Sequence, residues 1–317
     1  MKTKNKVLGV FSAVGVVTFA VHLSNKILYV LSNTSSSLRT NGRKTYEWKY
    51  GNISYKVSGT GSPVLLIHDL TCGSSDVEWK YIVSELSKTH TVYSIDLLGC
   101  GRSDKPALTY TNFLYVQLIT DFVRNVIGKR TDIITSGISS DIAIMACKND
   151  QSIFNKVILV NPGINSYISE KNKVAKNIIK NIFSLPVYGT LLFNLFNSFT
   201  KYTFLFNEKF FYNSKNIKHS YIKAYYDAAH NGRQSGRCLL SSILSGYTGC
   251  NVKNAIKDID NSILIIKGSY EEGIYEITSY YKELNPSIET ATIKYTKHLP
   301  HMESPEEFLR ILSIFIG

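Results

Sequence analysis

The stretch TDIITSGISSDIAIMAC, residues 131–147, decides how the rest of this chain is interpreted. It predicts a short buried strand at 133–135, a tight turn over 137–141 and then an apolar helix. Ser139 would lie at the N-terminus of that helix, where backbone N–H groups and the helix dipole favour negative charge. Its pattern is G-x-S-x-D, against the nucleophile-elbow pattern G-x-S-x-G. The stretch makes Ser139 a candidate nucleophile for acyl transfer, with an ordinary Ser/Gly turn before a helix as the alternative.

The composition is that of a globular chain with a sizeable core. The 317 residues are 44% hydrophobic and 19% charged, and 36 Lys and Arg against 24 Asp and Glu give a net charge of +12. The basic residues are scattered rather than gathered in one stripe, so nucleic-acid binding is not predicted. The five cysteines include no C-x-x-C pair, and neither a metal nor an organic cofactor is implied.

The N-terminal region differs in character from the rest of the chain. Lysines at the start precede an apolar run over residues 7–23, which is about the minimum length for a membrane-spanning helix. No clear small-residue cleavage site follows, so residues 1–31 are interpreted as an uncleaved signal anchor, followed by a flexible Ser-rich linker at 32–43. The leading lysines favour a catalytic part that lies outside the cytoplasm and is attached to the membrane by its N-terminus. The alternatives are a cleaved signal with a secreted product, a cytoplasmic-face orientation, and a helix that never spans.

From residue 44 onward, apolar strands alternate with amphipathic helices. Gly51 and Asn52 lie between two strand-like segments and predict a hairpin. Buried strands are then expected at 64–67, 92–95, 133–135, 156–160, 262–266 and 288–295. Buried strands separated by helices predict an α/β fold with a doubly wound, mostly parallel sheet. Between about 165 and 255 the sequence becomes helical and aromatic, which predicts a helical insertion into the sheet domain.

Three further stretches, together with residues 131–147, resemble one protein family. They are LLIHDLTCGSSDVEW at 65–79, SIDLLGCGRSDKP at 94–106 and KHLPHMESPEEF at 297–308. The resemblance is to the α/β-hydrolase fold in its helical-cap branch. That branch includes carboxylesterases, C–C bond hydrolases, haloperoxidase-like proteins and proline iminopeptidase-like enzymes. The resemblance implies a hydrolase core over 44–164 and 256–317, with a helical cap at 165–255.

The resemblance also implies a catalytic triad in the order Ser, acid, His. It maps these roles onto Ser139, Glu271 and His298, with the acid expected shortly after a strand that ends at Gly268. Glu272 is the alternative acid, because the family usually has Asp where this chain has Glu271. In this interpretation His298 takes the proton of the Ser139 hydroxyl as general base and later gives it to the leaving group.

The same family stabilises a developing oxyanion with two backbone N–H groups. One donor is expected at Ser140, directly after the predicted nucleophile, and the other at Leu70 or Asp69 in the loop after the first parallel strand. Two residues depart from the family pattern, since Asp69 replaces a glycine of that loop and Asp141 replaces the last glycine of the elbow. Both would add carboxylates near the predicted site, which is compatible with shifted specificity, weak activity or lost activity.

The sequence therefore predicts a serine hydrolase that cleaves an ester or related acyl bond of a small to medium apolar substrate through an acyl-enzyme. Amide and C–C bond cleavage stay open, and no oligomeric state is predicted. A serine at the elbow argues against the dehalogenase and epoxide-hydrolase branches of the family, which use Asp there. The alternative from a different class is a catalytically weak or inactive member that serves as a membrane-tethered binding module.

Overall fold

A computed structural model of the protein describes residues 2–34, 38, 41–163, 173–232 and 236–317. In this part of the chain one sheet of eight strands has the spatial order β1-β2-β4-β3-β5-β6-β7-β8. The strands are β1 (Lys44–Trp48), β2 (Gly51–Ser58), β3 (Ser62–Ile67), β4 (His90–Ile95), β5 (Thr131–Ser136), β6 (Phe154–Val160), β7 (Ile263–Gly268) and β8 (Glu289–Ile293).

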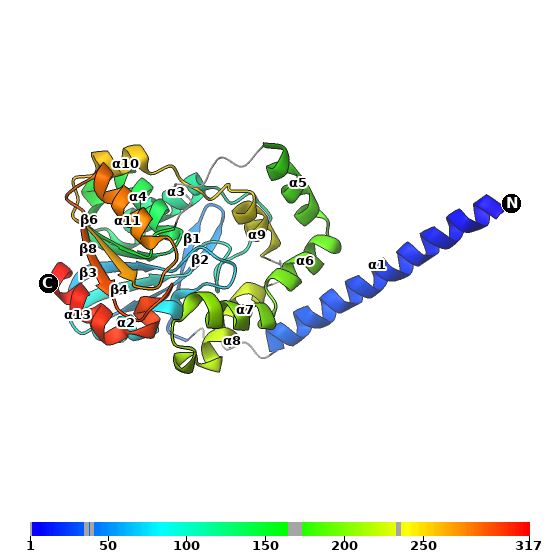
Figure 1. Ribbon diagram of the computed structural model, residues 1–317, viewed down its shortest axis with the longest axis horizontal. Helices are drawn as coiled ribbons and strands as arrows, with labels where there is room; N and C mark the ends of the chain where they lie inside the picture. Colours follow the sequence, from blue (N-terminus) through cyan, green and yellow to red (C-terminus); the bar gives the residue numbers. More distant parts are fainter. Residues whose placement is uncertain (1, 35–37, 39–40, 164–172, 233–235) are drawn as a thin grey trace.

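The sheet is parallel except at its N-terminal edge (Figure 1). β1 and β2 form the predicted hairpin and β2 pairs antiparallel with β4, while all neighbours from β4 to β8 pair in parallel. In its centre, residues 64–67 of β3 are completely buried because helices cover both faces of the sheet. The predicted α/β fold with a doubly wound, mostly parallel sheet is confirmed.

Helices of the sheet domain pack on both faces of the sheet. They are α2 (Lys80–Leu86), α3 (Asn112–Phe122), α4 (Ser139–Asn149), α10 (Lys253–Asp258), α11 (Ile274–Leu284), α12 (Pro300–Glu303) and α13 (Pro305–Ile316). Val64 and Leu66 of β3 lie in one core with α2 and α13, whereas Leu65 and Ile67 lie in a second core with α3, α4 and α11. The alternation follows from the two-residue repeat of a strand, which sends successive side chains to opposite faces.

Helices inserted between β6 and β7 form the predicted cap. They are α5 (Lys173–Ser184), α6 (Tyr188–Phe196), α7 (Phe199–Leu205), α8 (His219–His230) and α9 (Arg237–Leu244). Large aromatic residues of this insertion are buried and form its core: Phe193, Tyr202, Phe206, Phe211 and Tyr225. Much of the aromatic character of the insertion therefore stabilises the cap itself.

The N-terminal apolar segment forms one helix, α1 (Lys2–Thr34), which projects from the body of the molecule on the side of the cap (Figure 1). Asn25 Nδ2 donates to the Val187 carbonyl (3.0 Å), and Asn194 Nδ2 donates to Asn25 Oδ1 (3.0 Å), so α1 is fixed to the cap. Among the described residues no single helix is both long and apolar enough to cross a membrane, and the apolar part of α1 covers Val14–Val30. Residues 176–184 and 188–210 satisfy that test only as a pair bent by 106°.

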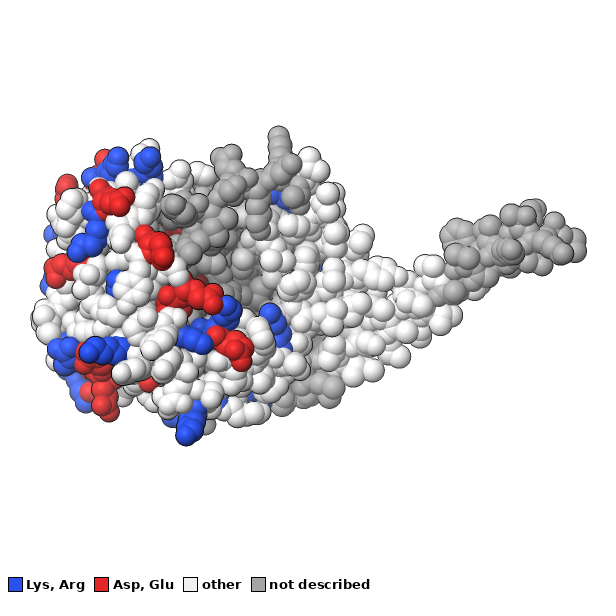
Figure 2. Space-filling model, in the orientation of Figure 1, with Lys and Arg blue, Asp and Glu red and all other residues white. Residues whose placement is uncertain are grey.

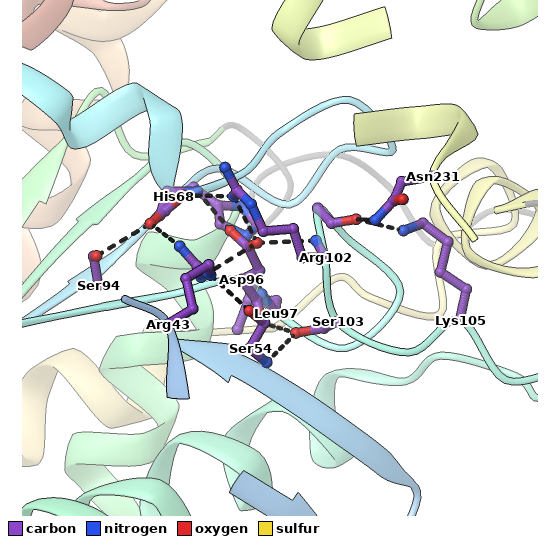
Figure 3. A network of polar contacts seen from close by, with 12 residues as sticks. Arg43, Ser54, His68, Ser94, Asp96, Leu97, Arg102, Ser103, Lys105 and Asn231 are labelled. Atoms are coloured by element: carbon purple, nitrogen blue, oxygen red, sulfur yellow. Dashed lines mark hydrogen bonds and ion pairs between the residues drawn. The ribbon is translucent and has the colours of Figure 1, made fainter. Parts of the chain in front are cut away.

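Buried ion pairs hold the loop after β4 in place (Figure 3). Arg102 Nη1 lies 3.0 Å from Asp96 Oδ2 and 2.8 Å from Asp76 Oδ1, and Arg43 pairs with the same two carboxylates. Burial alone would raise the pKa of Asp96, but Arg102 and Arg43 hold it below its usual value. A Cβ atom at Gly101 (φ 49°) would lie 2.5 Å from Asp96 Cγ, so the close approach requires glycine. In the stretch SIDLLGCGRSDKP, Asp96, Gly101 and Arg102 therefore hold the loop in its conformation.

Candidate active site

The turn between β5 and α4 has Gly137 at its apex. β5 extends to Ser136, α4 begins at Ser139, and Gly137 between them is in the left-handed backbone region (φ 55°). This is the position from which the nucleophile of a strand–turn–helix elbow projects above the sheet. A Cβ atom at Gly137 would lie 2.1 Å from Oδ1 of Asp69. The carboxyl group of Asp69 therefore fills the space that an elbow side chain would need.

The structure contradicts the prediction that Ser139 is the nucleophile. Ser139 lies in the first turn of α4, is completely buried, and donates its hydroxyl hydrogen to the His68 carbonyl (2.7 Å). Nε2 of His298, its predicted partner, faces Oδ2 of Asp69 instead. The Ser139 hydroxyl is thus a structural group that holds down the loop from which Asp69 projects.

His298 and Glu271 come together as the sequence predicts. His298 lies between β8 and α12, Glu271 lies just after β7, and Nδ1 of His298 is 2.9 Å from Glu271 Oε1. Glu272, the alternative acid, pairs with Lys209 Nζ (2.7 Å), and its side chain is 82% exposed. Phe210 of the cap stacks on the imidazole with ring centroids 5.4 Å apart. The geometry favours Glu271 over Glu272 as the residue that orients His298.

The loop that carries His298 is fixed from two sides. Asn161, just after β6, donates its side-chain amide hydrogens to the carbonyls of Lys297 (2.8 Å) and His298 (2.9 Å). Glu303 accepts hydrogen bonds from the N–H of Lys297 (3.1 Å) and from the N–H of Tyr212 (2.8 Å), which follows α7 in the chain. These bonds hold the imidazole in one place relative to the sheet and the cap.

A carboxylate occupies the position expected for the oxyanion. Oδ1 of Asp69 accepts hydrogen bonds from the backbone N–H groups of Ile138 (2.7 Å) and Leu70 (2.8 Å). Its other oxygen, Oδ2, lies 3.4 Å from Nε2 of His298. The Asp69 side chain is only 8% exposed. Two converging N–H groups form an anion-binding site, and this chain fills it with one of its own carboxylates.

Of the predicted oxyanion donors, only the Leu70 N–H is in place. The Ser140 N–H donates to the Gly137 carbonyl (3.1 Å) in the first turn of α4. The Asp69 N–H donates to Oε2 of Glu78 (3.2 Å) and therefore points away from the anion site. The structure contradicts the prediction of Ser140, which follows Ser139 rather than the apex residue Gly137, and it favours Leu70 over the alternative Asp69 as the second donor.

Ile138 and Glu78 are the residues of the site that the sequence analysis missed. Ile138 directly follows Gly137, and glycine is the residue type that most readily adopts a positive φ. The glycine was therefore the available sequence signal for the apex of the turn. Glu78 is buried under the loop of Asp69, where it accepts hydrogen bonds from Tyr225 Oη (2.7 Å) and Ser136 Oγ (3.0 Å), and burial raises its pKa. In the sequence, Glu78 is distinguished by its position directly before Trp79.

His68 joins the loops that follow β3 and β4. Its Nε2 accepts a hydrogen bond from the Leu97 N–H (3.0 Å; Figure 3). Nδ1 therefore carries the hydrogen and donates to the Asp69 carbonyl (2.7 Å). Ser139 holds the His68 carbonyl from the other side. These bonds fix the backbone of Asp69. Its carboxylate therefore has a fixed position relative to the N–H groups of Ile138 and Leu70.

Asp141, predicted to add a second carboxylate near the site, lies elsewhere. It is 1% exposed, and its Oδ1 accepts a hydrogen bond from Tyr281 Oη of α11 (2.7 Å). Burial raises the pKa of Asp141 to about 7. Because the apex is Gly137, Asp141 falls further along α4, on the side that packs against α11. Of the two residues that depart from the family pattern, Asp69 lies at the site and Asp141 does not.

The charge of His298 depends on its neighbours. Burial would lower the pKa of His298, but Glu271 and Asp69 on its two sides raise it well above the usual value. The two carboxylates therefore favour the protonated imidazolium form of His298. His301 in α12 behaves in the opposite way, because burial lowers its pKa to about 3, and its ring stacks on Trp79 with centroids 4.2 Å apart.

Comparison with known proteins identifies the family. The chain belongs to the alpha/beta hydrolase family, whose family model matches residues 64–311. It is similar to an uncharacterized protein of Mycobacterium tuberculosis, with 27% identity over 110 residues, 35% of this chain and 32% of the relative. It is also similar to proline iminopeptidase of Heyndrickxia coagulans, with 22% identity over 283 residues, 84% of this chain and 96% of the relative. The chain spans about a third of the length of the first curated relatives that it matches.

Solved structures show the same architecture. A serine hydrolase involved in carbazole degradation superposes with a TM-score of 0.70 at 16% identity, over 86% of this chain and 98% of that one. Bromoperoxidase from Bacillus anthracis superposes with a TM-score of 0.70 at 18% identity, over 86% and 99%. At these identities the likeness establishes the α/β-hydrolase fold, and the chemistry must be argued from the site itself.

Proposed function

We propose that the protein is a hydrolase in which His298 moves protons and Glu271 orients it. The observation that carries this proposal is that His298 contacts Glu271 on one side and Asp69 on the other. Oδ1 of Asp69 accepts hydrogen bonds from two backbone N–H groups. An imidazole held between two carboxylates is suited to general acid–base chemistry. The predicted acyl-enzyme on Ser139 is not part of the proposal, because that hydroxyl is bonded to the His68 carbonyl.

The surroundings of His298 combine one aromatic ring with a small cavity that is lined mostly by charged residues. The ring of Phe210 lies against the imidazole. A cavity of about 110 Å³ adjoins His298 and Glu271, and Tyr270 and the exposed Glu272 also line it. This cavity is large enough for a few water molecules, so water can reach the imidazole.

Glu271→Gln is expected to lower turnover by about 10²–10⁴-fold, because the variant removes the charge that orients and stabilises the imidazolium of His298. Glu272→Gln is the matched control, since its carboxylate pairs with Lys209 at the surface. Turnover by the full chain in detergent would be measured with p-nitrophenyl esters of short to medium acyl chains and with styrene oxide. Equal losses in the two variants would contradict the assignment of Glu271.

A non-catalytic binding module is the second candidate function. It is favoured by the absence of a side chain on Gly137 and by the carboxylate of Asp69 in the anion site. The same substrate panel separates the two candidates. A folded full-length chain that turns over neither the esters nor the epoxide would favour binding.

We further propose that α1 attaches the protein to a membrane, with the sheet domain on the extracytoplasmic side. The proposal is supported by the exposed apolar side chains of α1, which include Val16, Val17 and Phe19. On the face shown in Figure 2, charged residues gather over the sheet domain, whereas the part of α1 that is not drawn in grey shows no charged residue on this face. Lys2, Lys4 and Lys6 are expected to stay on the cytoplasmic side.

Val17→Glu with Phe19→Glu is expected to release the full chain from phospholipid vesicles, because each change places a carboxylate where α1 would meet hydrocarbon. The two side chains are 55% and 67% exposed, so the fold should tolerate the change. Phe113→Glu on α3 is the control, since Phe113 is 75% exposed but lies on the sheet domain. Flotation of both variants with vesicles on a density gradient measures the effect, and unchanged flotation of the α1 variant would contradict the proposal.

A further inference from the structure

We propose that Asp69 is the nucleophile of this site, and that it attacks a saturated carbon bearing an oxygen leaving group, as in an epoxide. The attack comes from the loop after β3 rather than from the elbow between β5 and α4. This inference rests on the proposed hydrolase function and narrows its substrate class. It also reverses the sequence-based argument against carboxylate chemistry, which assumed a serine at the apex.

The first argument is that the Asp69 carboxylate occupies the space that a side chain at position 137 would need. Gly137 has no side chain, and a Cβ there would lie 2.1 Å from Oδ1, 2.3 Å from Cγ and 2.8 Å from Oδ2 of Asp69. The Asp69 carboxylate therefore stands where an elbow side chain would stand, although it comes from a different strand. The glycine at the apex and the carboxylate in the loop are complementary, because neither position can change alone without a clash or a void.

The second argument is the orientation of the two oxygens. Oδ1 is held by the N–H groups of Ile138 and Leu70, whereas Oδ2 faces His298 Nε2 at 3.4 Å, longer than a good hydrogen bond. Beside this contact with His298, Oδ2 keeps a further electron pair for attack, and the backbone that carries it is fixed by the contacts of His68. A nucleophile held in one geometry next to an acid–base group is the arrangement that covalent catalysis requires.

The third argument selects the substrate class. Attack on an ester carbonyl produces an oxyanion on the substrate, but both N–H donors are already bonded to Asp69 Oδ1. Attack on a saturated carbon produces no such oxyanion and needs no vacant anion site. An oxygen leaving group needs a proton, and the imidazolium of His298 can supply it.

In the first step Oδ2 of Asp69 forms a bond to one epoxide carbon. The bond between that carbon and the ring oxygen breaks, and its electron pair goes to the oxygen. The oxygen takes a proton from His298, which becomes neutral. The product of this step is an alkyl ester of Asp69 that carries a free hydroxyl group on the neighbouring carbon.

In the second step neutral His298 takes a proton from water, and the hydroxide adds to Cγ of Asp69. The negative charge falls on Oδ1, where Ile138 and Leu70 already donate hydrogen bonds. The intermediate collapses by breaking the bond between Cγ and Oδ2, and the departing oxygen takes the proton from His298. Asp69, now holding the oxygen of the water, returns its proton to His298. The sum is one water added to the epoxide, which gives a diol.

The test is a single turnover of the full chain in water enriched in oxygen-18. The chain is in excess over styrene oxide, and mass spectrometry follows both the diol and the peptide that contains Asp69. We expect the label in the Asp69 peptide and an unlabelled diol from the first turnover, because the diol receives Oδ2 of the protein. Label in the diol with none in the peptide means direct attack by water and overturns the assignment of Asp69.

Asp69→Asn keeps an oxygen for the two N–H donors and should therefore fold, but we expect it to lower epoxide turnover by about 10³-fold or more. Asp141→Asn is the matched control, since Asp141 is bonded to Tyr281 and should leave turnover unchanged. A second outcome is that the chain turns over esters but not the epoxide, and that ester turnover requires His298 but not Asp69. That outcome would overturn the assignment of Asp69 as nucleophile and would still support the hydrolase function. A folded chain without turnover of either probe would overturn both.

Discussion

Gly137→Ser combined with Asp69→Gly is expected to turn the site into a serine hydrolase that a fluorophosphonate probe labels. The double change empties the N–H groups of Ile138 and Leu70 and places a hydroxyl at the apex of the turn. His298 is already oriented by Glu271 at 2.9 Å and would then act as general base for that hydroxyl. We expect the wild type to stay unlabelled and the double variant to be labelled completely.

The single change Gly137→Ser should instead destabilise the protein without creating a reactive serine. A side chain in the left-handed region costs about 1–2 kcal/mol. Forcing its Cβ against Asp69 Oδ1, at a distance of 2.1 Å, adds an overpacking cost of about 1–3 kcal/mol. The two positions should therefore be strongly non-additive, because Asp69→Gly removes the atoms that the new side chain would meet.

Probe labelling on a gel and the thermal unfolding midpoint measure both effects. His298→Gln in the double-variant background is the control, and it should abolish labelling because the hydroxyl loses its base. If Gly137→Ser alone is as stable as the wild type and is labelled, the carboxylate of Asp69 is not held in the anion site in solution.

Asp96→Ala is expected to lower the free energy of unfolding by about 3–5 kcal/mol, because it leaves the guanidinium groups of two buried arginines incompletely paired. The side chains of Arg43 and Arg102 are only 7% and 9% exposed. Asp96 also accepts hydrogen bonds from the N–H groups of Asp76 (2.8 Å) and Arg102 (2.9 Å), which the variant leaves without a partner.

Urea denaturation at neutral pH and in acid measures this effect. Since the folded pKa of Asp96 lies below the unfolded value of about 3.9, its contribution is complete above that pH and is lost as the pH falls through the folded-state pKa. The gap between wild type and variant should therefore close in strong acid. Asp258→Ala breaks the exposed pair with Lys148 and should cost only about 0–1 kcal/mol. Equal losses in both variants would contradict the role given to the Asp96 network.

Much of the molecule follows from local sequence. The apolar runs of the strands, the cap insertion and the motif around Asp96 each carry their own pattern, because burial on both faces and tight turns constrain residue types directly. The approach of His298 to Glu271 was also predictable, since each lies just beyond the carboxyl end of a parallel strand, and such ends meet at one edge of the sheet. Only the choice between Glu271 and Glu272 needed the structure.

The register of the elbow was decided by tertiary structure alone. The segment Gly137 to Ser140 offers a glycine and two serines for the apex, and its local sequence does not distinguish them. β5 continues to Ser136 because that residue pairs with Val160 of β6, and the Gly137 N–H then donates to the Val160 carbonyl (3.0 Å). The apex therefore falls on Gly137, Ser139 turns into the helix, and the space above the sheet is left for a carboxylate from another loop. Sequence by itself determined which segments meet at the site, whereas the pairing of strands distant in the chain decided which side chain stands at its centre.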